Sequence, residues 1–170
     1  DNKLAYVTED RKGNGLILSK SIKMNTSLAN MKGISNGQVI DADKEYAVAE
    51  EYRKKLKTKC PSVEQNVGNL SGGNQQKVVI AKWLTRDCDI LIFDEPTRGI
   101  DVGAKNEIYK LMNQLAAEGK AIIMISSEMT EILRMSDRIV VMCEGKKTGE
   151  LDISEATQEN IMNMATREIE

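Results

Sequence analysis

Two short, uninterrupted apolar runs, separated by an amphipathic stretch of helix length, limit the folds open to this chain. The runs are Ile90–Phe93 and Ala121–Ile125. Between them, residues 102–118 carry apolar side chains at helical spacing, and Gly119 stands where such a helix would stop. A strand, a crossover helix and a second strand of this kind build a parallel sheet whose two faces are covered by helices. The predicted fold class is therefore α/β.

The other elements are predicted around this sheet. A strand is expected at Leu4–Thr8, and a polar loop follows over residues 9–15. Helices expected at residues 22–31 and 41–57 make a helical insert over about residues 20–60. Beyond Pro61, we expect helices at 73–84, 129–135 and about 155–165, a further strand of the sheet at 138–143, and a turn at 144–146.

Composition excludes several kinds of chemistry. The 170 residues contain no histidine, so Ser-His-Asp and Cys-His catalytic systems and His-ligated zinc or haem are excluded. Cys60, Cys88 and Cys143 lie far apart, which argues against a disulfide framework or a thiolate metal site and favours a reducing cytoplasm. The net charge of −2 indicates no general attraction to nucleic acid. Every apolar stretch is far shorter than the roughly 20 residues that span a bilayer.

Two adjacent carboxylates follow the first apolar run. Asp94 and Glu95 would lie at the carboxyl edge of a parallel sheet, where ligands of open α/β sheets bind. Phosphoryl transfer uses such a pair, with one carboxylate holding Mg²⁺ and the other orienting the attacking water. An ordinary acidic turn would have the same sequence, so the surrounding residues must decide between the two.

A glycine-rich turn stands upstream of this strand. It reads Leu70-Ser71-Gly72-Gly73-Asn74-Gln75 and begins a predicted helix. Two glycines allow backbone N–H groups to approach an anion, Ser71 adds a hydroxyl donor, and the helix dipole is positive at this end. The turn is predicted to bind phosphate, and a serine-capped helix is the simpler alternative.

Together these motifs resemble the ATP-binding subunit of ABC transporters. Residues 70–75 resemble its signature motif, residues 90–95 its Walker B strand, and Gly99-Ile100-Asp101 its D-loop. The longer strings LSGGNQQK at 70–77 and EPTRGIDVGAK at 95–105 resemble the second nucleotide-binding domain of monosaccharide importers of the ribose, galactose or xylose type. The resemblance covers nearly the whole chain and implies a P-loop-NTPase-like sheet with a small helical subdomain.

The resemblance also exposes departures from the family pattern. Ser127 stands where most ABC domains have a histidine that contacts the γ-phosphate, and Glu9 replaces a glutamine that senses Mg²⁺ and water. The Walker A loop is missing. Residues 99–105 are a near match to that loop, which we reject because the spacing is wrong and Asn106 replaces the Mg²⁺-binding Ser or Thr. Because the first residue is Asp1, we expect 1–170 to be a partial domain cut before its Walker A region, and inactive alone.

The resemblance implies a division of roles. ABC domains pair head to tail, so Ser71, Gly72, Gly73, Asn74 and Gln75 would serve ATP held by a first domain of the same polypeptide. In this domain's own site, Glu95 would be catalytic and Asp94 would bind Mg²⁺, and Asp101, Glu9 and Ser127 would also face nucleotide. Residues 61–170 would hold the signature helix, Walker B strand, D-loop and the end of the catalytic core. The intact signature and altered Glu9 and Ser127 predict one hydrolytic and one degenerate site.

The implied partners are permease subunits, which the helical subdomain would contact, and, indirectly, a periplasmic or extracellular sugar-binding protein. No nucleic-acid partner is expected. The location would be the cytoplasmic face of a bacterial membrane, and the cofactors ATP and Mg²⁺. Three alternatives stay open: a nucleoside importer, a soluble ABC ATPase that does not transport, and a catalytically silent partner domain. The transported molecule is not predictable from these residues.

Overall fold

The computed structural model describes residues 3–166, so residues 1–2 and 167–170 of the predicted domain lie outside the described residues. The chain forms two compact units that divide between Ile125 and Ser126. The first unit holds a sheet, two long helices and a helical part. The second unit is a hairpin with two helices. No helix within residues 3–166 has the length and apolar character needed to cross a membrane.

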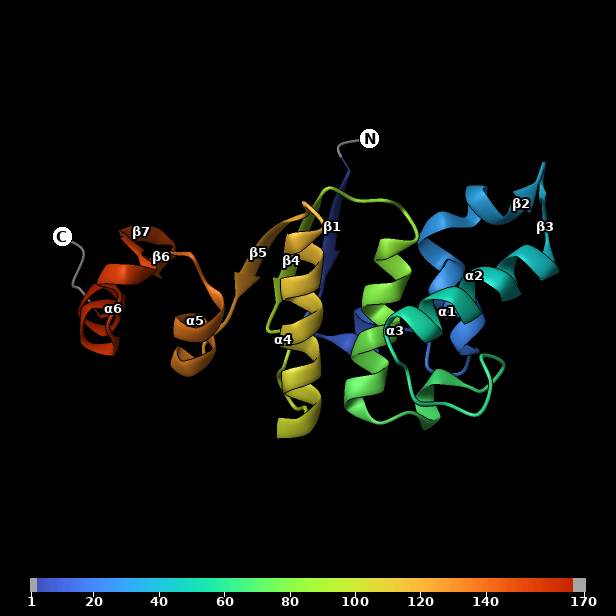
Figure 1. Cartoon of the computed structure of the whole chain (residues 1–170), viewed down its shortest axis with the longest axis horizontal. Helices are drawn as coiled ribbons and strands as arrows, with labels where there is room; N and C mark the ends of the chain where they lie inside the picture. The colour runs from blue at the N-terminus through green and yellow to red at the C-terminus, as the bar shows by residue number, and fades with distance from the viewer. Residues whose placement is uncertain (1–2, 167–170) are drawn as a thin grey trace. The chain divides into compact units, whose positions relative to one another are not determined.

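The first unit is built on a three-stranded parallel sheet, shown in Figure 1 with α4 beside it. The strands are β1 (Leu4–Val7), β4 (Ile90–Asp94) and β5 (Ala121–Ile125), in the order β1-β4-β5. Leu4 pairs with Ile90, and Ile90 with Ala121, so the three strands start in register. Their carboxyl ends therefore lie at one edge, which confirms the parallel α/β arrangement expected for these three strands.

Only one face of this sheet is deeply buried. Leu91 and Phe93 are both 0% exposed, and the register places them beside alternate residues of β1 and β5 on the same face. On the opposite face, Tyr6 is 44% and Ile123 51% exposed. Within the first unit, helices therefore lie over one face of the sheet, whereas the prediction had helices on both faces. A sheet covered on one face can contain the same continuous apolar strands as a sheet covered on two. The apolar runs therefore do not show how many faces are covered.

Two helices lie over the buried face. They are α3 (Gly72–Leu84) and α4 (Val102–Ala117). Asp101 caps α4, since its Oδ1 accepts a hydrogen bond of 3.0 Å from the Ala104 N–H. Gly119 follows α4 with φ of +88°, the left-handed conformation that commonly ends a helix. Both helices match the predicted ranges to within one residue at each end.

The predicted insert is helical with one addition. It contains α1 (Ile22–Ser27), the 3₁₀ segment η2 (Leu28–Ile34) and α2 (Ala42–Lys55). A two-residue antiparallel ladder, β2 (Ser35–Asn36) with β3 (Val39–Ile40), separates the helices, and η3 (Val67–Asn69) precedes α3. This hairpin was not predicted, because strands of two residues carry no periodicity. The polar loop after β1 contains a π-helical turn, η1 (Arg11–Gly15).

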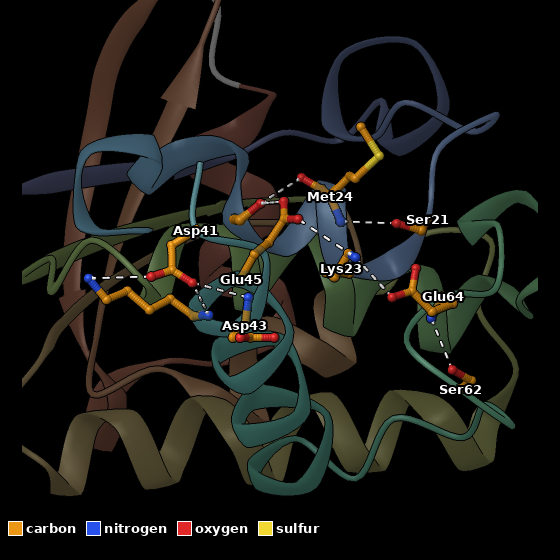
Figure 2. A network of polar contacts seen from close by, with 10 residues as sticks. Ser21, Lys23, Met24, Asp41, Asp43, Glu45, Ser62 and Glu64 are labelled. Atoms are coloured by element: carbon orange, nitrogen blue, oxygen red, sulfur yellow. Dashed lines mark hydrogen bonds and ion pairs between the residues drawn. The ribbon is translucent and has the colours of Figure 1, made fainter. Parts of the chain in front are cut away.

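A polar network joins the elements of this helical part (Figure 2). The Ser27 hydroxyl donates a 2.7 Å hydrogen bond to Glu45 Oε1, which is buried between α1 and α2. Lys23 lies between two carboxylates, with its Nζ 2.8 Å from Glu64 Oε1 and 3.9 Å from Glu45 Oε2. The side chain of Asp41 accepts hydrogen bonds from the first N–H groups of α2. The network connects α1, α2 and the segment that leads toward α3.

The second unit contains α5 (Met129–Met135), β6 (Arg138–Cys143), β7 (Lys146–Asp152), η4 (Ile153–Glu155) and α6 (Gln158–Ala165). Its core is Ile139, Val141 and Ile161. The prediction that residues 138–143 join the parallel sheet is wrong, because β6 pairs antiparallel with β7. Glu144 and Gly145 both have positive φ, as a two-residue hairpin turn requires. The turn was predicted, and the strand after it was not.

Candidate functional site

The two predicted carboxylates end β4. Asp94 is the last residue of the strand, and its Oδ2 accepts a hydrogen bond from the Tyr6 hydroxyl on β1. This hydrogen bond is the main reason why the pKa of the Tyr6 phenol lies above its ordinary value. Glu95 has a φ of +44°, and its N–H donates a 2.9 Å hydrogen bond to Ile125. The backbone therefore turns sharply at Glu95, a conformation that is uncommon for a non-glycine residue.

The predicted signature turn begins α3. Ser71 is the residue before the helix and is exposed, and its side chain makes no capping hydrogen bond to the helix backbone. Its Oγ instead accepts a 2.9 Å hydrogen bond from Asn74 Nδ2, while Asn74 Oδ1 accepts one of 2.9 Å from the Lys59 N–H. The first N–H groups of an α-helix have no partner within the helix, so this end can receive an anion. Gln75 is buried, and its Nε2 donates to the Val67 carbonyl.

Packing gives a second reason for the two glycines. A Cβ on Gly73 would lie 2.5 Å from the Cβ of Ala104, so α3 and α4 approach each other too closely for a side chain there. A Cβ on Gly72 would lie 3.3 Å from the Gly99 carbonyl oxygen. The glycines that the sequence analysis interpreted as a phosphate cradle therefore also let the turn pack against residues 99–104.

The predicted D-loop lies next to this turn. Gly99 has a φ of +67°, and Asp101 is exposed. The Asp101 carboxylate caps α4 in this structure, which gives it a structural role in addition to the one that the resemblance implies. The signature turn and the D-loop thus form one contiguous surface of the first unit, because Gly72 lies close to Gly99 and Gly73 lies close to Ala104.

Glu9 has a cationic partner that the sequence analysis missed. Arg98 forms an ion pair with Glu9, and both side chains are exposed. The negative charge of the Glu9 carboxylate therefore has a positive neighbour, the Arg98 guanidinium. Arg98 lies inside the string EPTRGID, but nothing in that string indicates a partner 89 residues away. A pocket of about 310 Å³ is lined by Glu9, Asp10, Arg11, Lys12 and Arg98.

Ser127 belongs to the second unit, so its position is described only within that unit. It is an exposed residue in the segment before α5. The neighbouring Ser126 hydroxyl donates to Glu131 and accepts a 3.1 Å hydrogen bond from the Glu128 N–H. Ser126 therefore organises the start of α5, and Ser127 is the serine exposed beside it.

The donor set fits Mg²⁺ held together with a nucleotide. Residues 3–166 contain no cluster of three or more His, Cys, Asp or Glu side chains that could hold a metal ion. Mg²⁺ commonly binds one or two carboxylates, with phosphate oxygens and water completing its octahedron. Asp94 at the strand end suits that mode. A larger cavity of about 740 Å³ lies along α2, beside Pro61 and Ser62, and involves none of the predicted site residues.

Comparisons with known proteins agree with these motifs. A family model described as "ABC transporter" matches residues 2–98. A putative ribose/galactose/methyl galactoside import ATP-binding protein of Burkholderia ambifaria is 58% identical over 165 residues, which cover 96% of this chain and 32% of that protein. An L-arabinose transport ATP-binding protein of Geobacillus stearothermophilus is 58% identical over 166 residues, which cover 98% of this chain and 32% of that protein. The chain thus spans about a third of the length of these relatives.

Solved structures support the same fold. A putative metal-chelate type ABC transporter in an inward-facing conformation matches with a TM-score of 0.79 at 13% identity, over 95% of this chain and 62% of that one. An ATP-binding cassette in a post-hydrolysis dimer with ADP and phosphate matches with a TM-score of 0.73 at 22% identity, over 89% of this chain and 63% of that one. The fold and the sequence relatives agree with the signature, Walker B and D-loop motifs, and the chain belongs to the ABC transporter family.

Proposed function

We propose that this chain is part of the ATP-hydrolysing subunit of a bacterial importer for monosaccharides. The observation that carries the proposal is the sequence identity of 55–58% over nearly the whole chain to import or transport ATP-binding proteins named for ribose, galactose, arabinose and xylose. Its partners would be membrane permease subunits and, indirectly, an extracytoplasmic sugar-binding protein. The subunit would act at the cytoplasmic face of the membrane.

Within the importer, the signature turn would bind ATP held by a first nucleotide-binding domain of the same polypeptide. The exposure of Ser71 and the free end of α3 support this role, since a hydroxyl and backbone N–H groups there can donate to a γ-phosphate. The packing of Gly73 on Ala104 would fix the direction in which these donors point. Positioned donors of this kind stabilise the charge that develops during phosphoryl transfer.

The domain's own site would use the carboxyl edge of the sheet. Asp94 would hold Mg²⁺, with Tyr6 orienting its carboxylate through the hydrogen bond to Oδ2. Mg²⁺ held there would supply positive charge that offsets the negative charge of the phosphate groups. Glu95 would orient the attacking water and accept its proton. Ser127 has no imidazole to contact a γ-phosphate, and the Glu9 carboxylate is paired with the Arg98 guanidinium. We therefore infer that this site hydrolyses ATP less well than the other site of the pair.

The test is steady-state ATPase activity of the full importer in membranes. Ser71→Arg would place a bulky cation at the facing γ-phosphate and remove most of the activity, a loss of about 10²-fold or more by analogy with deleted transition-state donors. Glu95→Gln would cost much less. Ser19→Arg is the matched control, because Ser19 is exposed and outside the motifs. A crippled Glu95→Gln enzyme together with a nearly normal Ser71→Arg enzyme would overturn the assignment.

A further inference from the structure

Arg11 lies in the loop after β1, close to both the D-loop and the signature turn. Arg11 Nη1 donates a 2.9 Å hydrogen bond to the carbonyl oxygen of Arg98. Its Nη2 lies 3.4 Å from the place that a Cβ on Gly72 would occupy, and 3.8 Å from the corresponding place at Gly99. The Arg11 guanidinium therefore contacts Arg98, the residue before the D-loop, and lies close to the signature turn. The Arg11 backbone belongs to the loop after β1.

The Arg11 side chain is partly buried and incompletely hydrogen-bonded. The side chain is half-buried, and burial lowers the pKa of its guanidinium, which nevertheless stays charged at physiological pH. Among residues 3–166, its buried Nε has no hydrogen-bond partner. A buried donor without a partner destabilises the fold, so stability alone gives a poor reason for a guanidinium at this place.

Arg11 and Arg98 form a reciprocal link between two loops. The Arg98 side chain pairs with Glu9, and the Arg98 carbonyl receives the hydrogen bond from Arg11. Arg11 is the first residue of the π-helical turn η1, which Asp10 caps by accepting a 2.9 Å hydrogen bond at Oδ1 from the Gly13 N–H. A shift of the loop at residues 9–11 therefore moves the guanidinium, and with it the contacts at Gly72 and Gly99.

We propose that Arg11 is a positioning residue that sets the signature turn, Ser71–Gly73, against the D-loop segment and passes changes in the Glu9 loop to that turn. The inference rests on the proposed function, because it assumes that the signature turn serves ATP on the facing domain. On this proposal, Arg11 acts through the turn. Lysine cannot replace it fully, since an ammonium lacks the planar fork that reaches Arg98 and Gly72 together.

The test is ATPase kinetics of the full importer, with kcat and the KM for ATP measured separately. Arg11→Met is expected to raise the KM for ATP about tenfold, because a displaced signature turn binds the facing nucleotide less well. Arg11→Lys recovers part of this loss. Lys20→Met removes a positive charge from an exposed residue outside the motifs and is expected to leave both constants unchanged. The thermal midpoint of each variant is measured in parallel.

A double-mutant cycle with Ser71→Ala separates positioning from general structure. If Arg11 acts through the turn, Arg11→Met adds no more than about twofold to the defect of Ser71→Ala. Independent multiplication of the two defects, or a wild-type KM for Arg11→Met, overturns the inference. If Arg11→Met does not fold, Arg11→Lys carries the same cycle. Normal activity of Ser71→Ala would instead overturn the proposed function, so the two failures are distinguishable.

Discussion

The approach of α3 to α4 at Gly73 gives a prediction whose size follows from the structure. In Gly73→Ala, the new Cβ would lie 2.5 Å from the Cβ of Ala104, whereas ordinary contacts lie at 3.4–4 Å. Neither atom belongs to a flexible side chain, so the two helices must separate by about 1 Å. Overpacking of this kind costs about 1–3 kcal/mol, and alanine returns at most about 1 kcal/mol of helix propensity. The net expectation is a loss of about 1 kcal/mol.

Thermal unfolding of the full-length ATP-binding subunit measures this effect. A loss of about 1 kcal/mol lowers the midpoint by about 2–4 °C for a domain of this size class. The matched control is Gly103→Ala, which also changes the second residue of a helix. There the Cβ would meet only the Asp101 side chain, at 3.3 Å. That variant is expected to be as stable as the wild type, or slightly more stable.

The exchanged pair tests the cause. Gly73→Ala with Ala104→Gly places one Cβ between the helices, as in the natural protein, so the clash disappears. The double variant should be at least about 1 kcal/mol more stable than the sum of the single effects predicts. Additive single effects, or a Gly73→Ala protein that melts like the wild type, would refute the packing argument.

Two further predictions concern the helical part and the isolated chain. Glu45→Ala leaves the Ser27 hydroxyl and Lys23 without their shared carboxylate, and it should lower the free energy of unfolding of the full-length subunit in urea by about 1–3 kcal/mol. Glu45→Gln should cost less, and Glu51→Ala, at an exposed position, almost nothing. Equal stability of all three variants would contradict the role of the network. The 170-residue chain alone should show no measurable MgATP binding by titration calorimetry. A helix N-terminus contributes only about 0.3–2 kcal/mol to the binding of an anion, whereas micromolar affinity needs about 8 kcal/mol. A micromolar dissociation constant would contradict this prediction.

The sequence predicted the elements whose signals are local. Uninterrupted apolar runs located β4 and β5, and helical spacing with Gly119 as the stop located α4. The same signals did not decide pairing, because the apolar run at 138–143 suits a parallel or an antiparallel neighbour equally. In the structure this run pairs antiparallel with β7, through a turn in which Glu144 and Gly145 have positive φ. Which face of the sheet is covered was likewise not encoded in apolar runs.

The motifs of the candidate site were predictable from the sequence, whereas the contacts between their residues were not. Ser71, Gly72 and Gly73 were identified as a glycine-rich turn before a predicted helix and by their resemblance to the signature motif, but the need for glycine at position 73 comes from Ala104, 31 positions later. The Arg98 partner of Glu9 and the contacts of Arg11 join residues far apart in sequence. Such pairs depend on how the loops meet in space, and a single sequence carries no signal for them.

The central claim is that the signature turn of this domain binds ATP seated on a facing domain. A cryo-EM structure of the full importer with a non-hydrolysable ATP analogue tests it most directly. The account predicts Ser71 Oγ at about 3 Å from a γ-phosphate oxygen of nucleotide bound by the first nucleotide-binding domain. A closed importer in which both triphosphates are occupied and Ser71 lies far from either would contradict it.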